Sequence, residues 1–172
     1  TVKKILNTDS VSYKSQGHLT NGQQTSGNIF SINNKSMIKI KRIIESEVEK
    51  YRALFQSKEE GFLVNWPPMY KLFGWLVNIK SGGELAPHMH ETGWISGTAY
   101  INVPSKTKTN AGNLVLTLGE KQDETETRKN VEKIIDVTTG NLILFPALLS
   151  HYTIPFEAHE ERIVLAFDVI PE

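Results

Sequence analysis

The sequence predicts a mainly-β protein, an antiparallel β-sandwich or barrel preceded by one amphipathic helix. Two observations indicate this class. Residues 36–57 repeat apolar side chains at steps of three and four, the spacing of one face of an α-helix. After Gly61, short strand-like segments follow one another between Gly, Pro and polar turns. Because no helical segment separates these strands, antiparallel pairing is favoured over a parallel α/β sheet.

Length and composition limit the classes of protein. A chain of 172 residues is expected to form a single domain, 1–172, with residues 1–60 as an N-terminal extension and 61–172 as the β core. Lys plus Arg and Asp plus Glu both number 19, so charge points to neither nucleic acid nor an anionic membrane as a partner. The absence of cysteine excludes disulfides, thiolate-bound metals and thiol catalysis. Without a signal peptide or a bilayer-spanning apolar run, a cytoplasmic location is expected.

The N-terminal extension begins with a polar stretch, residues 10–36, dominated by Ser, Gly, Asn, Gln and Thr. It predicts a loop or a weakly paired edge strand, in which His18 is exposed to solvent. Ser36 is the expected N-cap of the helix that follows. The apolar stripe of this helix is expected to pack against the rest of the protein; its residues are Met37, Ile40, Ile44, Val48, Tyr51 and Phe55.

Six strands are predicted after the helix: Leu72–Lys80, Trp94–Val103, Asn113–Leu118, Lys133–Val137, Asn141–Phe145 and Arg162–Ile170. The segment Gly119–Asp136 is long, charged and poor in apolar residues until Val131. It connects strands that should border a functional site. We expect either a mobile loop beside the open side of that site or a solvated hairpin far from it.

Three of the five histidines indicate a metal site. His88 and His90 alternate at the end of a predicted strand, so they present two imidazoles to the same face. His151 follows a second strand, which runs from Gly140 to Pro146. A third imidazole beside the first two would complete a facial metal site with open positions, close to the geometry of non-haem Fe(II) oxygenases.

The alternation of two further strands predicts a polar cavity next to the histidines. One face of the strand at 94–103 carries Ser96, Thr98, Tyr100 and Asn102, and one face of the last strand carries Arg162, Val164, Ala166 and Asp168. Arg162 lies eleven residues after His151 and is suited to grip a carboxylate through two parallel hydrogen bonds. The alternative is an ordinary strand-end arginine paired with Glu160 or Glu161.

The order of these residues resembles the 2-oxoglutarate/Fe(II)-dependent oxygenase family, which is often found behind tetratricopeptide repeats or in phage genomes. The resemblance covers roughly residues 70–171, whereas residues 1–60 resemble no family that we can name. It rests on His88-x-His90, Ser96-Gly97-x-x-Tyr100, Gly112-Asn-Leu, Gly140-Asn-Leu-Ile-Leu-Phe-Pro146, His151 and Arg162-Ile-x-x-Ala-Phe-Asp. The resemblance implies a double-stranded β-helix, or jelly roll, for residues 61–172.

The resemblance also implies an activity, cofactors and site residues. We expect an Fe(II)/2-oxoglutarate-dependent dioxygenase, a hydroxylase whose substrate the sequence does not identify. His88 and His151 would bind the iron, and Arg162 and Tyr100 would hold the distal carboxylate of 2-oxoglutarate. From their positions along the chain, Asn78 is predicted as a further polar residue of the cofactor pocket and Trp94 as a roof over the substrate entrance.

One position departs from the wider superfamily, which places Asp or Glu two residues after the first histidine. This chain has His90 there, and Glu91 follows. Alternation turns Glu91 to the opposite face unless the strand bulges. The third metal ligand is therefore His90 or Glu91, and we favour His90.

Two alternatives remain at this stage. The spacing of Gly82 to the histidine pair, and of Gly140 to Pro146 and His151, also fits much of the two cupin motifs. Some cupins are three-histidine dioxygenases that do not use 2-oxoglutarate. Against a cupin, the glutamate that usually follows the pair is missing, and Leu148 stands where the second motif has glycine. The other alternative is a metal-free, non-catalytic jelly-roll binding module, which would make the three histidines coincidental.

Overall fold

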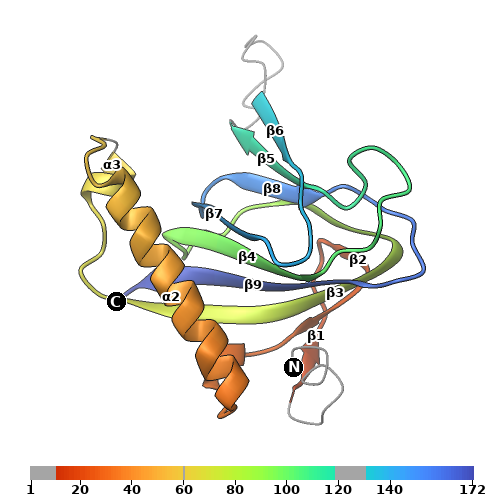
Figure 1. The fold of residues 1–172 in the computed structure, drawn as a ribbon, viewed down its shortest axis with the longest axis horizontal. Helices are drawn as coiled ribbons and strands as arrows, with labels where there is room; N and C mark the ends of the chain where they lie inside the picture. The colour runs from red at the N-terminus through yellow and green to blue at the C-terminus, as the bar shows by residue number, and fades with distance from the viewer. Residues whose placement is uncertain (1–10, 60, 119–130) are drawn as a thin grey trace.

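The computed structural model describes residues 11–59, 61–118 and 131–172, and confirms a mainly-β antiparallel fold (Figure 1). All of the strand pairs in this part of the chain are antiparallel. The helices are η1 (Ile29–Ser31), α2 (Lys35–Phe55) and α3 (Gly61–Val64). The strands are β1 (Tyr13–Lys14), β2 (Leu19–Thr25), β3 (Tyr70–His88), β4 (Ile95–Asn102), β5 (Leu114–Leu118), β6 (Val131–Ile135), β7 (Leu142–Pro146), β8 (Ser150–Thr153) and β9 (Arg162–Pro171).

The strands form one curled sheet in the order β6-β5-β8-β3-β9-β4-β7. In addition, β2 pairs with β3, and β1 pairs with β2. Strand β3 links the two halves of this sheet. Its first part, Tyr70–Ile79, pairs with β9, whereas His88 near its end pairs with His151 on β8. Gly82 has φ +71°, a backbone conformation that favours glycine, and its N–H donates to the carbonyl of Phe156 at 2.7 Å. The strand predicted to end at Lys80 therefore continues through a glycine bend and delivers His88 to the second half of the sheet.

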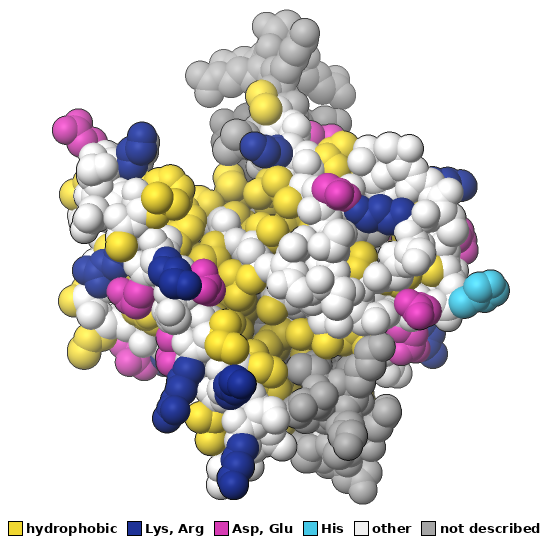
Figure 2. All heavy atoms as spheres, viewed as in Figure 1, with side chains coloured by type: hydrophobic (Ala, Val, Ile, Leu, Met, Phe, Trp, Pro, Cys, Tyr) yellow, Lys and Arg dark blue, Asp and Glu magenta, His cyan; other side chains and the backbone are white. Residues whose placement is uncertain are grey.

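Helix α2 covers one face of β4, β9 and β3 (Figure 1). Its buried side chains, Met37, Ile44 and Val48, belong to a core cluster with Leu76 and Phe167 of the sheet. Charged side chains of both signs lie on the outer side of α2, whereas hydrophobic side chains gather between the helix and the strands (Figure 2). The apolar stripe read from the sequence is thus the packing face of the helix.

The predicted N-cap was wrong by two residues. Asn34, not Ser36, caps α2, because its side-chain oxygen accepts hydrogen bonds from the N–H groups of Ser36 and Met37 at 2.9 and 3.4 Å. Either residue type is a good cap, and the extended backbone at Asn34 decides between them. The helix ends at Phe55, close to the predicted residue 57.

Other boundaries differ where elements are short. The four-residue strand β8, which carries His151, was not among the predicted strands, and β6 begins two residues earlier than predicted. The polar N-terminal stretch forms β1 and β2; β2 pairs with β3 from Leu19 to Gln24 and with β1 at Gln24 and Thr25. Of the charged segment 119–136, residues 119–130 lie outside the described part of the chain. No helix in the described ranges is long and apolar enough to span a membrane.

Candidate active site

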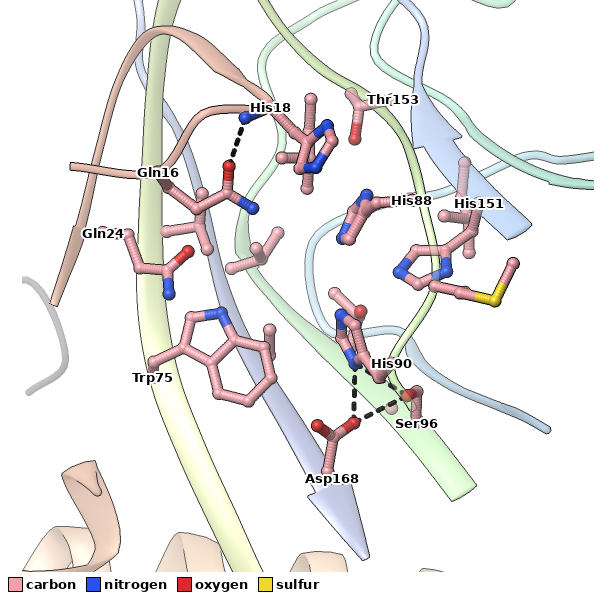
Figure 3. Close-up of a pocket in the computed structure, with 18 of the residues that line it drawn as sticks. Gln16, His18, Gln24, Trp75, His88, His90, Ser96, His151, Thr153 and Asp168 are labelled. Atoms are coloured by element: carbon pink, nitrogen blue, oxygen red, sulfur yellow. Dashed lines mark hydrogen bonds and ion pairs between the residues drawn. The ribbon is translucent and has the colours of Figure 1, made fainter. Parts of the chain in front are cut away.

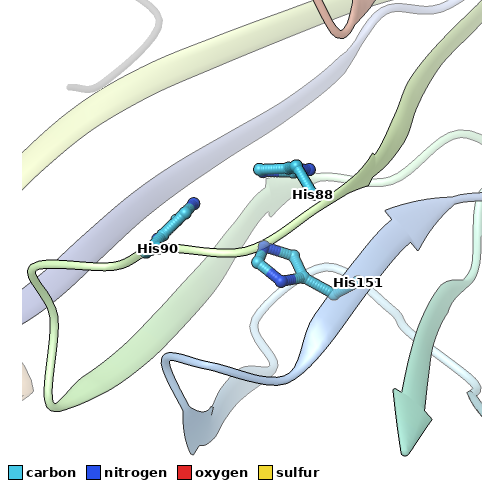
Figure 4. Close-up of side chains that lie close together, drawn as sticks. All are labelled: His88, His90 and His151. Carbon is cyan, nitrogen blue, oxygen red and sulfur yellow. The ribbon is translucent and has the colours of Figure 1, made fainter. Parts of the chain in front are cut away.

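Three histidine side chains converge on one point (Figure 4). Their ring centroids lie 5.2 Å apart for His88 and His90, 4.3 Å for His88 and His151, and 5.0 Å for His90 and His151. One ligand atom from each ring lies within 4.8 Å of the other two. Because His88 and His151 are register partners across β3 and β8, the backbone itself sets two rings side by side.

Backbone carbonyls orient two of these rings. The Nδ1 atom of His88 lies 2.9 Å from the carbonyl oxygen of Ala86, and that of His151 lies 2.9 Å from the carbonyl oxygen of Leu149. A carbonyl only accepts hydrogen bonds, so each Nδ1 carries the hydrogen and each Nε2 keeps its lone pair. Such an outer partner is the usual companion of a metal-binding histidine.

Burial keeps both of these imidazoles neutral. It lowers the pKa of His88 below its ordinary value. Burial, aided by the nearby His88, lowers the pKa of His151 to about 3. A neutral imidazole is the form that binds a metal ion.

The third ring, His90, is held by side chains. Its Nδ1 lies 2.7 Å from Oδ1 of Asp168 and 2.9 Å from Oγ of Ser96, and the Ser96 hydroxyl donates to the same Asp168 oxygen at 2.6 Å (Figure 3). The Trp75 ring contacts His90 with centroids 5.4 Å apart. The side chain of Glu91, the other predicted third ligand, is exposed. The structure therefore brings together His90, and not Glu91, with the other two histidines.

A cavity of about 530 Å³ opens next to the histidines, in the range of small-molecule sites (Figure 3). It follows the predicted faces of two strands. From β4 it is lined by Ser96, Thr98 and Tyr100, and from β9 by Arg162, Val164, Ala166 and Asp168. Asn102, predicted on the same face, does not line it; its side chain donates to the carbonyl of Glu161 at 2.7 Å.

Arg162 is a buried cation without an acidic partner among the described residues. Its exposed fraction is 2%, and its Nε donates to the carbonyl oxygen of Gly112 at 3.2 Å. Glu161, one of the acids considered as its partner, instead accepts a hydrogen bond from Asn78 at 2.8 Å. Burial lowers the pKa of Arg162 from its ordinary value. Because a guanidinium is not deprotonated in proteins, Arg162 is still charged at neutral pH.

Tyr100 lies directly against Arg162. The guanidinium carbon stands 5.1 Å from the centroid of the Tyr100 ring. The Tyr100 hydroxyl is buried, and no described residue makes a hydrogen bond with it. Burial raises the pKa of Tyr100, so the hydroxyl stays protonated and can donate. Among the described residues, the buried charge has no acidic partner and the buried hydroxyl has no hydrogen-bond partner, so the pair suits an anionic acceptor in the cavity.

Two predicted site residues lie elsewhere. Asn78 sits on the opposite face of β3 from Trp75, outside the cavity, where it bonds to Glu161. Trp94 does not line the cavity either; it stacks on Phe62 at a centroid distance of 5.9 Å, beside the core under α2. The bends at residues 91, 92 and 94 break the strand alternation after His90, which explains why Trp94 turns away.

Several cavity residues were not predicted. Trp75 shares its β3 face with Phe73 and Val77, and the same alternation that located Tyr100 would have located it. Gln16, His18 and Gln24 reach the cavity from the N-terminal segment (Figure 3). His18 is exposed, as expected, but its ring also stacks on His88 at 5.7 Å. No local pattern connects that segment to the histidines.

The donor set fits a divalent iron and a dicarboxylate. Three imidazoles, two of them kept neutral by burial, and no thiolate suit Fe(II) among other divalent metals. At the other end of the same cavity, the unpaired guanidinium of Arg162 and the Tyr100 hydroxyl suit a carboxylate.

Comparison with known proteins identifies the family. The model of the family described as "Putative 2OG-Fe(II) oxygenase" matches residues 74–168, more than half of the chain. No curated protein matches. This match favours the oxygenase interpretation over the cupin and the non-catalytic alternatives.

Solved structures show the same fold. A prolyl-4-hydroxylase from Pseudomonas putida has a TM-score of 0.67 at 12% identity, with 99% of this chain and 82% of that chain covered. HygX from Streptomyces hygroscopicus, solved with nickel and 2-oxoglutarate, has a TM-score of 0.65 at 11% identity and covers 99% and 76%. A prolyl hydroxylase from Trichoplax adhaerens, solved with a peptide fragment, has a TM-score of 0.62 at 16% identity and covers 98% and 74%.

These likenesses confirm the double-stranded β-helix, and the family match places the three histidines and the unpaired arginine in an enzyme. The chain belongs to the 2-oxoglutarate/Fe(II)-dependent oxygenase family of dioxygenases, whose members use Fe(II) and 2-oxoglutarate.

Proposed function

We propose that the protein hydroxylates a substrate in a reaction that consumes O₂ and 2-oxoglutarate. The observation that carries this proposal is the placement of Arg162, a buried cation without an acidic partner among the described residues, in the same cavity as the three histidines. The Nε2 atoms of His88, His90 and His151 would hold Fe(II). Arg162 and Tyr100 would bind the distal carboxylate of 2-oxoglutarate through charge-assisted hydrogen bonds.

The bound cofactors supply the oxidising chemistry: O₂, 2-oxoglutarate and R–H become R–OH, succinate and CO₂. The chain positions them. Because Arg162 is anchored to the Gly112 carbonyl and packed on Tyr100, its guanidinium offers a fixed fork for one end of the dicarboxylate. That fixes the distance at which the other end can approach the histidines.

The walls between these two ends exclude water. Val164 and Leu114 are buried, and Phe145 is buried against His151 with centroids 4.8 Å apart. An apolar lining strengthens the interaction between the guanidinium and a carboxylate.

We place the substrate on the side of the cavity formed by the N-terminal segment. Gln24 is 7% exposed and lines the cavity. Gln16 and Trp75 line the same cavity (Figure 3). Uncharged amides and an indole favour a substrate that presents a neutral hydrogen-bonding group rather than a phosphate.

The test is turnover of 2-oxoglutarate. With Fe(II), ascorbate and O₂, purified protein should release succinate, and a true substrate should raise that rate and gain one oxygen atom by mass spectrometry. Candidate substrates should include peptides, amides and nucleosides. Protein that binds the metal at the histidines but neither binds nor consumes 2-oxoglutarate would overturn the proposal in favour of a cupin-like reaction.

A further inference from the structure

We propose that Asp168 is a positioning residue that supplies the negative charge of the metal site through His90. In the wider superfamily a carboxylate follows the first histidine by two residues; here that position is an imidazole, and a carboxylate stands directly behind it. The inference rests on the proposed function, because it takes the three histidines as the metal ligands. Asp168 is not one of the three ligands, so its role is to orient His90 and to supply negative charge from behind it.

Two hydrogen bonds converge on one oxygen atom of Asp168. Oδ1 accepts from Nδ1 of His90 at 2.7 Å and from the hydroxyl of Ser96 at 2.6 Å (Figure 3). Ser96 and Asp168 are register partners on β4 and β9, so their side chains leave neighbouring strands on the same face. The carboxylate is thus fixed by the sheet, and His90 is fixed by the carboxylate.

The charge of Asp168 has no other compensation among the described residues. Asp168 is 6% exposed, and His90 is its one ion-pair partner there. The cation on the same strand face, Arg162, lies six residues away on β9. A buried carboxylate without a cation is costly. A divalent ion bound to His90 would balance the negative charge of Asp168, because only the His90 ring would separate the two.

The surrounding backbone leaves room for the carboxylate. A Cβ atom added at Gly93 would lie 3.2 Å from Oδ1 of Asp168 and 2.9 Å from the Cβ of Ala147. Any larger residue at position 93 would press on the Asp168 side chain. On its other side, the His90 ring contacts Trp75. Asp168, Ser96 and Trp75 therefore fix the orientation of the one ligand that no backbone carbonyl holds.

The physical consequence is a metal site whose ligand strength depends on an outer carboxylate. A carboxylate that accepts the Nδ1–H raises the electron density at Nε2 and makes the imidazole a stronger ligand. Loss of such an outer partner typically costs about 10–100-fold in metal affinity. Substitution of Asp168 should therefore weaken the metal and change its ligand field, even though Asp168 does not touch it.

The experiment is a metal titration that does not involve turnover. Co(II) serves as the probe, with visible absorption for its ligand field and a competing chelator for its affinity. Asp168→Asn keeps the shape and an amide oxygen for the Nδ1–H but removes the charge. We expect Co(II) binding about 10–100-fold weaker, with shifted absorption bands. Asp136→Asn, at an exposed carboxylate paired with Lys106, is the matched control and should change neither.

A pair of variants separates charge from packing. His90→Asp places a carboxylate beside Asp168, so the two negative charges repel and this variant should bind Co(II) poorly. The double variant H90D/D168N removes the repulsion and restores a single carboxylate at the site. It should bind Co(II) more tightly than H90D alone, although D168N weakens binding in the wild-type background.

The outcomes are distinct. Two results would overturn the role of Asp168 and leave the proposed function intact. One is an Asp168→Asn variant whose Co(II) affinity and absorption spectrum are unchanged. The other is a loss of Co(II) affinity on D168N that has the same size in the wild-type and H90D backgrounds. Co(II) binding that is unaffected by His88→Ala would overturn the proposed function itself. Each variant is compared with the wild type by its unfolding transition without metal, so that a misfolded protein is recognised.

Discussion

The guanidinium of Arg162 stacks on the ring of Tyr100, with its central carbon 5.1 Å from the ring centroid, and both side chains are buried in the cavity of the histidines. Among the described residues, Arg162 has no acidic partner and the Tyr100 hydroxyl has no hydrogen-bond partner. This pair is therefore suited to bind an anion from outside the chain. The first two predictions test it.

Arg162→Ala should abolish most of the affinity for 2-oxoglutarate and leave metal binding nearly unchanged. A charge-assisted pair in a buried site is lost while the histidines stay, at a cost of roughly 2–5 kcal/mol. Calorimetry with Mn(II) as the metal measures both constants without turnover. Equal 2-oxoglutarate affinity in wild type and variant would remove the main support for the cofactor pocket.

Tyr100→Phe should have a smaller effect on the same measurement. It removes one hydrogen bond to the carboxylate, worth about 1 kcal/mol, or roughly fivefold in affinity. Without the cofactor the variant should be as stable as the wild type or more so, because its buried hydroxyl has no partner among the described residues. Thermal unfolding with and without 2-oxoglutarate checks both halves; a variant destabilised in the absence of 2-oxoglutarate contradicts the assignment.

His88→Ala and His151→Ala should each weaken Fe(II) binding by more than about 100-fold, since even outer partners of metal ligands account for 10–100-fold. His159→Ala and Glu91→Gln are the controls, because both side chains are exposed and His159 lies outside the cluster. Both controls should bind Fe(II) as the wild type does. A large loss in Glu91→Gln would restore Glu91 as the third ligand.

Gln24→Ala should raise the KM for substrate without changing the affinity for 2-oxoglutarate, once a substrate is known. Its amide lines the cavity but belongs to the N-terminal segment rather than to β4 or β9. Gln23→Ala, one residue along β2 and outside this cavity, is the matched control. A change in 2-oxoglutarate affinity instead of KM would place Gln24 with the cofactor.

Gly97→Ala should destabilise the fold by about 1–3 kcal/mol, a typical cost of overpacking a core. A Cβ at this position would overlap the ring of Phe167, which is fully buried against helix α2. Gly17→Ala, where nothing lies within 4 Å, should be nearly neutral. Urea unfolding measures both, and equal midpoints for the two variants would show that the sheet relaxes around the new methyl group.

Much of the site followed from local periodicity. The alternation of β4 and β9 predicted which residues face the cavity, from Ser96 and Tyr100 to Arg162 and Asp168, because side chains of a strand point to alternate faces. The prediction failed at Trp94, where alternation stops, and at Asn78, where alternation was not applied. At Trp94 the chain bends, and at Asn78 the parity of β3 points away from the cavity.

The sequence by itself determined the fold class, the amphipathic helix, the pairing of His88 with His90 on one face, and the arginine eleven residues after His151. These depend on steps of two, three or four residues along one segment. Only the tertiary structure decided that Asp168 stands behind His90, that Arg162 has no acid beside it among the described residues, and that Gln16, His18 and Gln24 form a wall of the cavity. Those relationships depend on residues far apart in the sequence, such as His90 and Asp168 at a separation of 78 positions, and strand pairing and burial, rather than local spacing, bring them together.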